Sequence, residues 1–127
     1  MMETVLTQKS PVPLGHYSQA VIHNGLVYVA GQLPIDPQHE NQPLQSLEDQ
    51  TRQVLQNLDE ILLASGSDRN HVLKVTIYLT DLAHWATVND IYGRFFGKHK
   101  PARSAVPVKT LPKGYFLEID VIAAQVK

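Results

Sequence analysis

The sequence predicts an α+β fold, a two-layer sandwich in which two helices cover one face of a mixed β-sheet. Two stretches carry apolar residues at helical spacing, and three others alternate apolar and polar residues or form short apolar runs typical of strands. A strong hairpin signal precedes them all. The predicted order is hairpin, helix, strand, helix, strand, strand, in one domain that spans residues 1–127.

The first structured segment, residues 20–31, has the pattern of a β-hairpin. Asn24 and Gly25 stand between two apolar runs. A type I′ turn requires a positive φ angle at both central residues, and Asn-Gly is the pair that best tolerates it. Residues 34–43, which contain three prolines and no periodicity, predict a loop.

Both helices have boundary signals. Ser46 can cap the N-terminus of the first helix, with Asp49 three residues later, and Gly66 can end it. Asp81 can cap the second helix, and Pro101 lies beyond its end. The first apolar stripe consists of Leu47, Val54, Leu55, Leu58, Ile61 and Leu62, and the second of Trp85, Val88, Tyr92, Phe95 and Phe96.

Residues 71–81, 104–108 and 115–126 are predicted to form strands. The alternation in the first of these places Leu73, Val75, Ile77 and Leu79 in the core, with Lys74, Thr76 and Tyr78 on the other face. Pro107 cannot donate a hydrogen bond to a ladder, so its strand is expected to be short, bulged or at an edge. One sheet face would stay bare, and its Val and Ile side chains favour an oligomer.

The composition excludes several classes of protein. Lys and Arg number 11 and Asp and Glu 12, a net charge of −1, which leaves no charge excess to attract nucleic acid or an anionic membrane. The chain has no cysteine, which excludes disulfides, thiolate nucleophiles and Cys-ligated metals. Residues 1–13 show no secretory signal, and no apolar run reaches the ~20 residues of a membrane span. We therefore expect a cytoplasmic protein.

Arg103 and Glu118 have the placements most suggestive of chemistry. Arg103 stands where "PARSAVPV" enters a strand. It is either a strand-end salt bridge or a clamp for a carboxylate, which a guanidinium binds through two parallel hydrogen bonds. Glu118 lies either on a solvated strand face or in a cleft, where it could act as a base. A hairpin of the last two strands would bring the two residues together.

Weaker signals come from "GHYSQ" and "AGQLP". Tyr17 is either a half-buried ring or a pocket residue with its hydroxyl turned inward. Gly31 permits close approach of a neighbouring strand or of a ligand. The six histidines show no metal-ligand spacing, so no metal site is expected. The aromatic residues from Trp85 to Phe96 are expected in the core.

Together these segments resemble the RidA (YjgF) family of small imine deaminases. The resemblance runs nearly end to end, through "PLGHYSQA", "VYVAGQLPIDP", "VLKVTIYLTDL" and "ATVNDIYGRFF", and above all through "PARSAVPV" followed by "LPKGYFLEIDVIA". It implies a chorismate-mutase-like α+β fold with a six-stranded sheet. It also implies a homotrimer with ligand clefts between subunits that hydrolyses 2-iminobutanoate or 2-iminopropanoate, products of pyridoxal-phosphate-dependent dehydratases, to 2-keto acids and ammonia.

The resemblance further implies roles for five residues. Arg103 would bind the substrate carboxylate, and Glu118 would position the attacking water. Tyr17 and Gly31 would line the cleft, with Asn89 close to it. Glu118 would accept the proton of the water and return a proton to the departing ammonia, and no cofactor would be needed because a protonated imine is already electrophilic.

Three positions depart from the family pattern. His16 replaces a common proline, Ala30 a common serine, and Ala105 a common cysteine. The hydrolysis does not need the thiol, so activity is expected to persist, but the loss of two polar groups leaves the substrate range open.

Two other functions stay open on the sequence. The same cleft could bind or sense 2-keto acids without useful turnover. Some family members carry the label of endoribonuclease or translation inhibitor, which the net charge of −1 and the lack of a basic stripe disfavour here.

Overall fold

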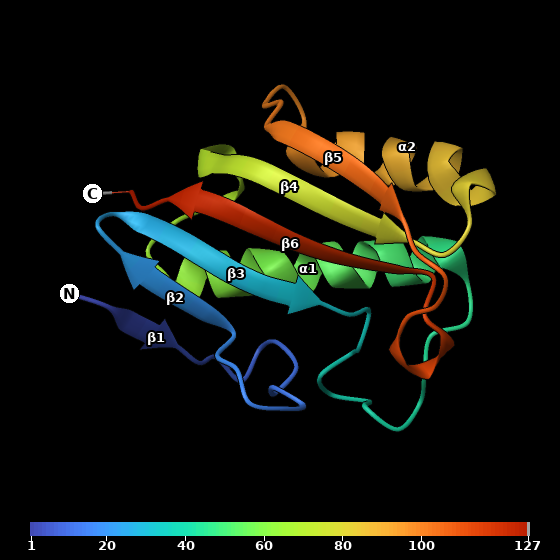
Figure 1. Cartoon of the computed structure of the whole chain (residues 1–127), viewed down its shortest axis with the longest axis horizontal. Helices are drawn as coiled ribbons and strands as arrows, with labels where there is room; N and C mark the ends of the chain where they lie inside the picture. Colours follow the sequence, from blue (N-terminus) through green and yellow to red (C-terminus); the bar gives the residue numbers. More distant parts are fainter. Residues whose placement is uncertain (127) are drawn as a thin grey trace.

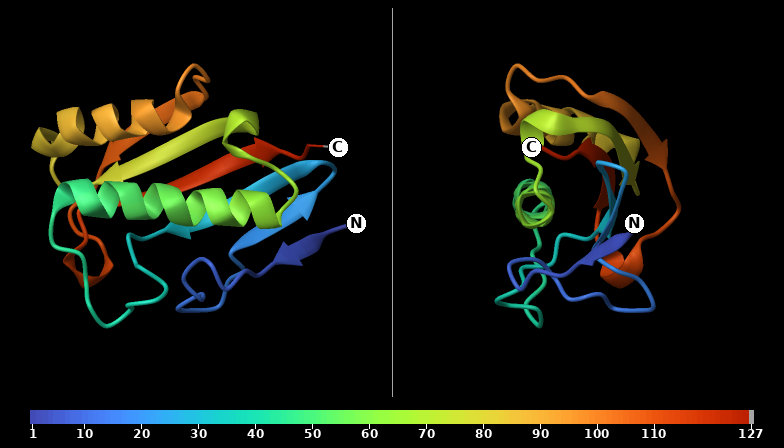
Figure 2. Two further views of the ribbon diagram at one scale, coloured as in Figure 1. Left: turned by 180° about the vertical axis from the view of Figure 1, so that it is seen from behind. Right: turned by 90° about the vertical axis from the view of Figure 1, so that its left-hand side faces the viewer.

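The computed structural model describes residues 1–126, which form a six-stranded mixed sheet with two α-helices on one face. Figure 1 shows the sheet, and Figure 2 shows both helices on the same side of it. The predicted two-layer α+β fold is confirmed. The predicted domain ends at Lys127, which lies outside the described residues. The strands are β1 (Glu3–Val5), β2 (Ala20–His23), β3 (Leu26–Gln32), β4 (Val72–Leu79), β5 (Ala102–Pro107) and β6 (Leu117–Ala124).

The strand order is β1-β2-β3-β6-β4-β5. β4 and β5 are parallel, and the other neighbouring pairs are antiparallel. Parallel neighbours need a crossover connection, which helix α2 (Trp85–Phe96) supplies. The suggested hairpin of the last two strands is therefore wrong, because β4 lies between β5 and β6. The edge position expected for the strand with Pro107 is confirmed.

Local signals set the element boundaries. Asn24 and Gly25 have φ angles of 52° and 78° in the turn between β2 and β3. Helix α1 (Leu47–Ala64) begins where the backbone N–H of Asp49 donates to the Ser46 side chain. Asp81 caps a single 3-10 turn (Leu82–His84) that leads into α2, so its role differs from the predicted one.

The core lies between the helices and one face of the sheet, and all the predicted helix-stripe residues pack into or against it. One predicted core residue is misplaced. Leu73 is 48% exposed, whereas Val72 is fully buried. The pairing of β4 with β6 shifts register between Val72 and Lys74, and such an irregularity reverses the side-chain alternation on one side of it.

The other face of the sheet and its β5 edge are open. Every residue of β5 is exposed. Tyr28, which pairs with Ile122 on the neighbouring strand, is 43% exposed on the face away from the helices. This structure thus has both an unpaired edge strand and a partly apolar uncovered face, and the second is the feature for which the sequence favoured an oligomer.

One buried amide ties the loop after β3 to helix α1. Asn57 is 0% exposed, and its Nδ2 donates to the backbone carbonyls of Leu33 and Ile35 over 3.2 and 2.9 Å. Its own backbone carbonyl accepts from Ser10 Oγ at 2.7 Å, and its Oδ1 accepts from Gln53 at 2.9 Å. A single helix residue therefore fixes two segments that are distant in sequence.

Replacing this amide is expected to destabilise the fold strongly. Asn57→Ala leaves two backbone carbonyls without their donor, at a cost of roughly 2–4 kcal/mol in the free energy of unfolding. Urea denaturation at one protein concentration measures the difference from wild type. Gln53→Ala is the matched control, since it removes only the more exposed partner. An Asn57→Ala variant no less stable than this control would contradict the role of the amide.

Candidate active site

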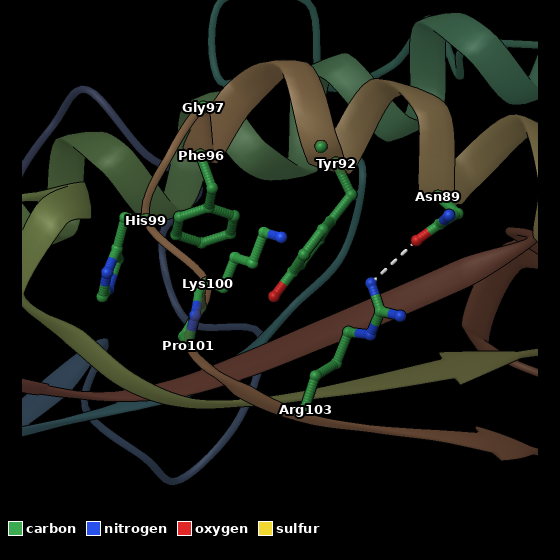
Figure 3. A pocket seen from close by; sticks show the side chains of 9 residues that line it. Asn89, Tyr92, Phe96, Gly97, His99, Lys100, Pro101 and Arg103 are labelled. Carbon is green, nitrogen blue, oxygen red and sulfur yellow. Dashed lines mark hydrogen bonds between the residues drawn. The ribbon is translucent and has the colours of Figure 1, made fainter.

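Helix α2 holds Arg103 at the start of β5. Arg103 is in register with the buried Val75 of β4, so it points to the helix side of the sheet at its edge. Its Nη1 donates to Asn89 Oδ1 at 2.8 Å, and its Cζ lies 4.6 Å from the ring centroid of Trp85 and 4.9 Å from that of Tyr92. Figure 3 shows this arrangement of Asn89, Tyr92 and Arg103. The guanidinium is thus oriented by an amide and two aromatic rings.

Within residues 1–126, Arg103 differs from the other arginines in having no carboxylate partner. Each of the other three forms an ion pair with an aspartate: Arg52 with Asp49, Arg69 with Asp59, and Arg94 with Asp90. The strand-end salt bridge left open by the sequence is therefore not formed in this part of the chain. The guanidinium keeps N–H donors beyond the one bound to Asn89, and such donors can bind a carboxylate in the bidentate manner.

Glu118 lies in a second and separate place. Its neighbours Leu117 and Ile119 are buried on the helix side, and Glu118 points to the other face. A Cβ atom on Gly31 would collide with the Glu118 carboxyl group, so the glycine leaves the space that the carboxyl occupies. A cavity of about 490 Å³ surrounds the carboxyl and is lined by Leu14, Gly15, Tyr17, Ala30, Gly31, Leu33, Pro112 and Glu118.

The Glu118 carboxyl holds its proton more strongly than usual. Burial raises its pKa above the ordinary value, and the nearby Asp120 carboxylate raises it further. Tyr78 donates its hydroxyl hydrogen to Asp120 Oδ2 at 3.1 Å, which keeps that second carboxylate in place. A carboxyl whose pKa is raised toward neutrality is suited to both accept and return a proton.

The structure therefore divides the five predicted site residues into two groups. Arg103 and Asn89 belong to the helix side of the β5 edge, and Tyr17, Gly31 and Glu118 to the opposite face near β3 and β6. The proximity suggested for Arg103 and Glu118 does not occur within one chain, because β4 separates their strands and their side chains point to opposite faces.

Sequence reasoning missed the part that aromatic residues play around Arg103. Trp85 and Tyr92 were placed in the core, and they do pack against or into it. They also share one face of α2 with Asn89, since the three residues follow at i, i+4 and i+7. That spacing, combined with an arginine in the strand that follows, could have predicted that these residues surround Arg103.

Residues 1–126 were expected to hold neither a metal site nor a membrane span, and two observations bear on these expectations. No group of three or more His, Asp or Glu side chains there is placed to hold a metal ion. Neither α-helix in that range is long and apolar enough to cross a membrane.

Comparison with known proteins identifies the family. The family model described as Endoribonuclease L-PSP matches residues 7–125. The chain belongs to this family, which is also called RidA or YjgF. The resemblance drawn from the sequence motifs is thereby confirmed.

Relatives within the RidA family match over nearly the whole chain. "Reactive Intermediate Deaminase A, chloroplastic" of Arabidopsis thaliana is 48% identical, over 95% of this chain and 65% of that protein. "2-iminobutanoate/2-iminopropanoate deaminase" of Rattus norvegicus is 41% identical, over 97% and 90%. The crystal structure of E. coli TdcF with bound serine superposes with a TM-score of 0.93 at 36% identity, over 98% of this chain and 99% of that one.

The raised pKa of Glu118 predicts that Glu118→Gln stabilises the fold at neutral pH. A carboxyl whose folded-state pKa is raised binds its proton more tightly in the native state, so ionisation above that pKa weakens folding. The variant removes this penalty. Its melting temperature should exceed that of wild type at pH 7, and the gain should vanish below the ordinary glutamate pKa of about 4.3. Thermal unfolding at several pH values measures the gain.

Glu40→Gln, at an exposed loop position, is the matched control for this measurement. A Glu118→Gln variant less stable than wild type at pH 7 would show instead that the Glu118 carboxylate is held by a stabilising ion pair.

Proposed function

We propose that this protein hydrolyses 2-imino acids such as 2-iminobutanoate and 2-iminopropanoate to 2-keto acids and ammonia. The observation that carries the proposal is the presence of two complementary groups, an arginine without an acidic partner in residues 1–126 and a half-buried carboxyl in a largely apolar cavity. The names of the rat and Arabidopsis relatives support it. So does the serine bound to TdcF, which carries a carboxylate next to a carbon bonded to nitrogen.

The reaction needs an anchor and a proton carrier. Arg103 binds the substrate carboxylate through two hydrogen bonds, which fixes the adjacent imine carbon. A water molecule attacks that carbon while Glu118 accepts its proton. Glu118 then returns the proton to the carbinolamine nitrogen, and the C–N bond breaks as the carbinolamine hydroxyl loses its proton to the departing ammonia, which leaves the keto acid. Imine and water are consumed, keto acid and ammonia are formed, and no cofactor takes part.

We propose that the two groups meet between chains, in a homotrimer with a cleft at each subunit boundary. The Arg103 group of one chain would face the Glu118 cavity of its neighbour, since one chain holds them on opposite faces of the sheet. The exposed β5 and the uncovered sheet face supply surface for such contacts. A ring that joins two different surfaces of each chain closes without further copies.

We also propose that the chain is one domain that works in the cytoplasm, which its lack of cysteine fits. The description of the family names an endoribonuclease. A net charge of −1, and the pairing of Arg52, Arg69 and Arg94 with aspartates, leave little cationic surface for RNA. Imine hydrolysis is therefore the function we favour. Measured release of ammonia would separate it from ligand binding without turnover.

Removing the proposed anchor should abolish most of the activity. Arg103→Ala leaves the substrate carboxylate unpaired, which typically costs about 2–5 kcal/mol, or roughly 30-fold to several thousand-fold in kcat/KM. Arg103→Lys should recover little, because lysine lacks the planar pair of donors. Semicarbazone trapping of an imine generated by an amino acid oxidase gives kcat/KM.

Arg94→Ala is the matched control for the anchor, since Arg94 is exposed and already paired with Asp90. Unchanged kinetics in Arg103→Ala, together with a lowered melting temperature, would assign Arg103 a purely structural role.

A site shared between chains predicts complementation. Arg103→Ala and Glu118→Gln should each be nearly inactive alone, the second because general-base help is typically worth 10²–10⁴-fold. Random mixing of the two variants by unfolding and refolding should restore about one quarter of the sites, which combine the intact residue of each. Recovered activity and light scattering together measure this. A monomeric mass at micromolar concentration, or no recovery in mixed trimers, would refute the shared cleft.

A further inference from the structure

A second cavity lies directly beside Arg103, between the C-terminal half of α2 and the start of β5 (Figure 3). Its volume is about 350 Å³. It is lined by Asn89, Tyr92, Gly93, Phe96, Gly97, His99, Lys100, Pro101 and Arg103. None of these residues lines the Glu118 cavity, so the cavity beside Arg103 is separate from it.

The charge of this cavity is positive and uncompensated. Arg103 and Lys100 both line it, and no carboxylate of the described residues does. Neither cation forms an ion pair within residues 1–126. His99 is engaged elsewhere, since its Nε2 lies 2.7 Å from the Val72 carbonyl. Two like charges around one small space favour the entry of an anion.

Tyr92 provides an independent indication of a ligand. The residue is 6% exposed, and its hydroxyl forms no hydrogen bond of good geometry within residues 1–126, although the Arg103 guanidinium lies beside it. Figure 3 shows that hydroxyl turned into the cavity, on the side of Lys100 and Arg103. Burial raises the pKa of the phenol, which keeps it a neutral donor. The Tyr92 ring packs against Phe96, which accounts for the ring but leaves the buried hydroxyl to be explained.

We propose that this cavity is a second anion-binding subsite, which admits 2-imino acids that carry another carboxylate on the side chain. The inference rests on the proposed imine hydrolysis. Arg103 keeps the carboxylate next to the imine carbon, the Tyr92 hydroxyl donates to the distal carboxylate, and Lys100 pairs with it. Arg103, Tyr92 and Lys100 line the same cavity, so the two carboxylates of one short-chain substrate can reach both positions. The substrate class therefore includes imines of acidic amino acids.

Binding of keto-acid products tests the subsite without turnover. Calorimetric titration with 2-oxoglutarate and 2-oxobutanoate compares ligands with and without the distal carboxylate. We expect wild type to prefer 2-oxoglutarate by about tenfold or more, and Lys100→Gln and Tyr92→Phe each to weaken its binding about fivefold to tenfold. The affinity of Lys100→Gln for 2-oxobutanoate should stay within about twofold. Lys98→Gln, an exposed lysine in the same loop outside the cavity, is the matched control.

Turnover then separates the subsite from the proposed function. kcat/KM is measured on imines generated by oxidases from L-glutamate and from L-2-aminobutanoate. A selective loss on the dicarboxylate imine in Lys100→Gln supports the subsite. Equal losses on both imines, or a wild type that shows no preference for 2-oxoglutarate in calorimetry, overturn it. If wild type hydrolyses neither imine but still binds 2-oxoglutarate selectively through Tyr92 and Lys100, the subsite stands and the deaminase function fails.

Discussion

The alternation of side chains across a β-sheet is the constraint on which this site depends. Arg103 shares the face of the buried Val75, whereas Glu118 lies on the face away from the buried Leu117 and Ile119. No change of rotamer brings a side chain through its own sheet. Within one chain the proposed anchor and proton carrier therefore cannot reach the same substrate, which is why the proposed cleft lies between chains.

The site concentrates groups whose positions do not favour folding. Arg103 lacks a counter-ion and Tyr92 a hydrogen-bond partner in the described residues, and Glu118 is held in surroundings that raise its pKa. By contrast, the buried Asn57, which takes no part in the proposed chemistry, has both its amide oxygen and its amide nitrogen bonded. Polar groups without partners are expected where a bound ligand completes their ion pairs and hydrogen bonds.

Sequence reasoning succeeded where the determinant was local. The Ser46 cap and the Asn24-Gly25 turn each depend on a few neighbouring residues, and both formed as predicted. Sequence reasoning failed where contacts between segments distant in sequence determine the structure. The irregular pairing with β6 exposes Leu73, and the crossover through α2 places β5 beyond β4. The residues of the candidate site came mainly from the family resemblance, because charge and spacing alone left both Arg103 and Glu118 with a structural alternative. The cavity beside Arg103 was not foreseen, since Tyr92 has the spacing of a core residue.

Pro107 gives the exposed β5 a property beyond this site. An edge strand with free backbone groups is a template for open-ended strand addition, the growth mode of fibrils. Pro107 has no N–H to offer a newcomer, and it stands at the last position of β5. An isolated chain would thus present an exposed edge whose last position cannot donate to a growing ladder. The strand that carries Arg103 thereby also limits how an isolated chain can misassemble.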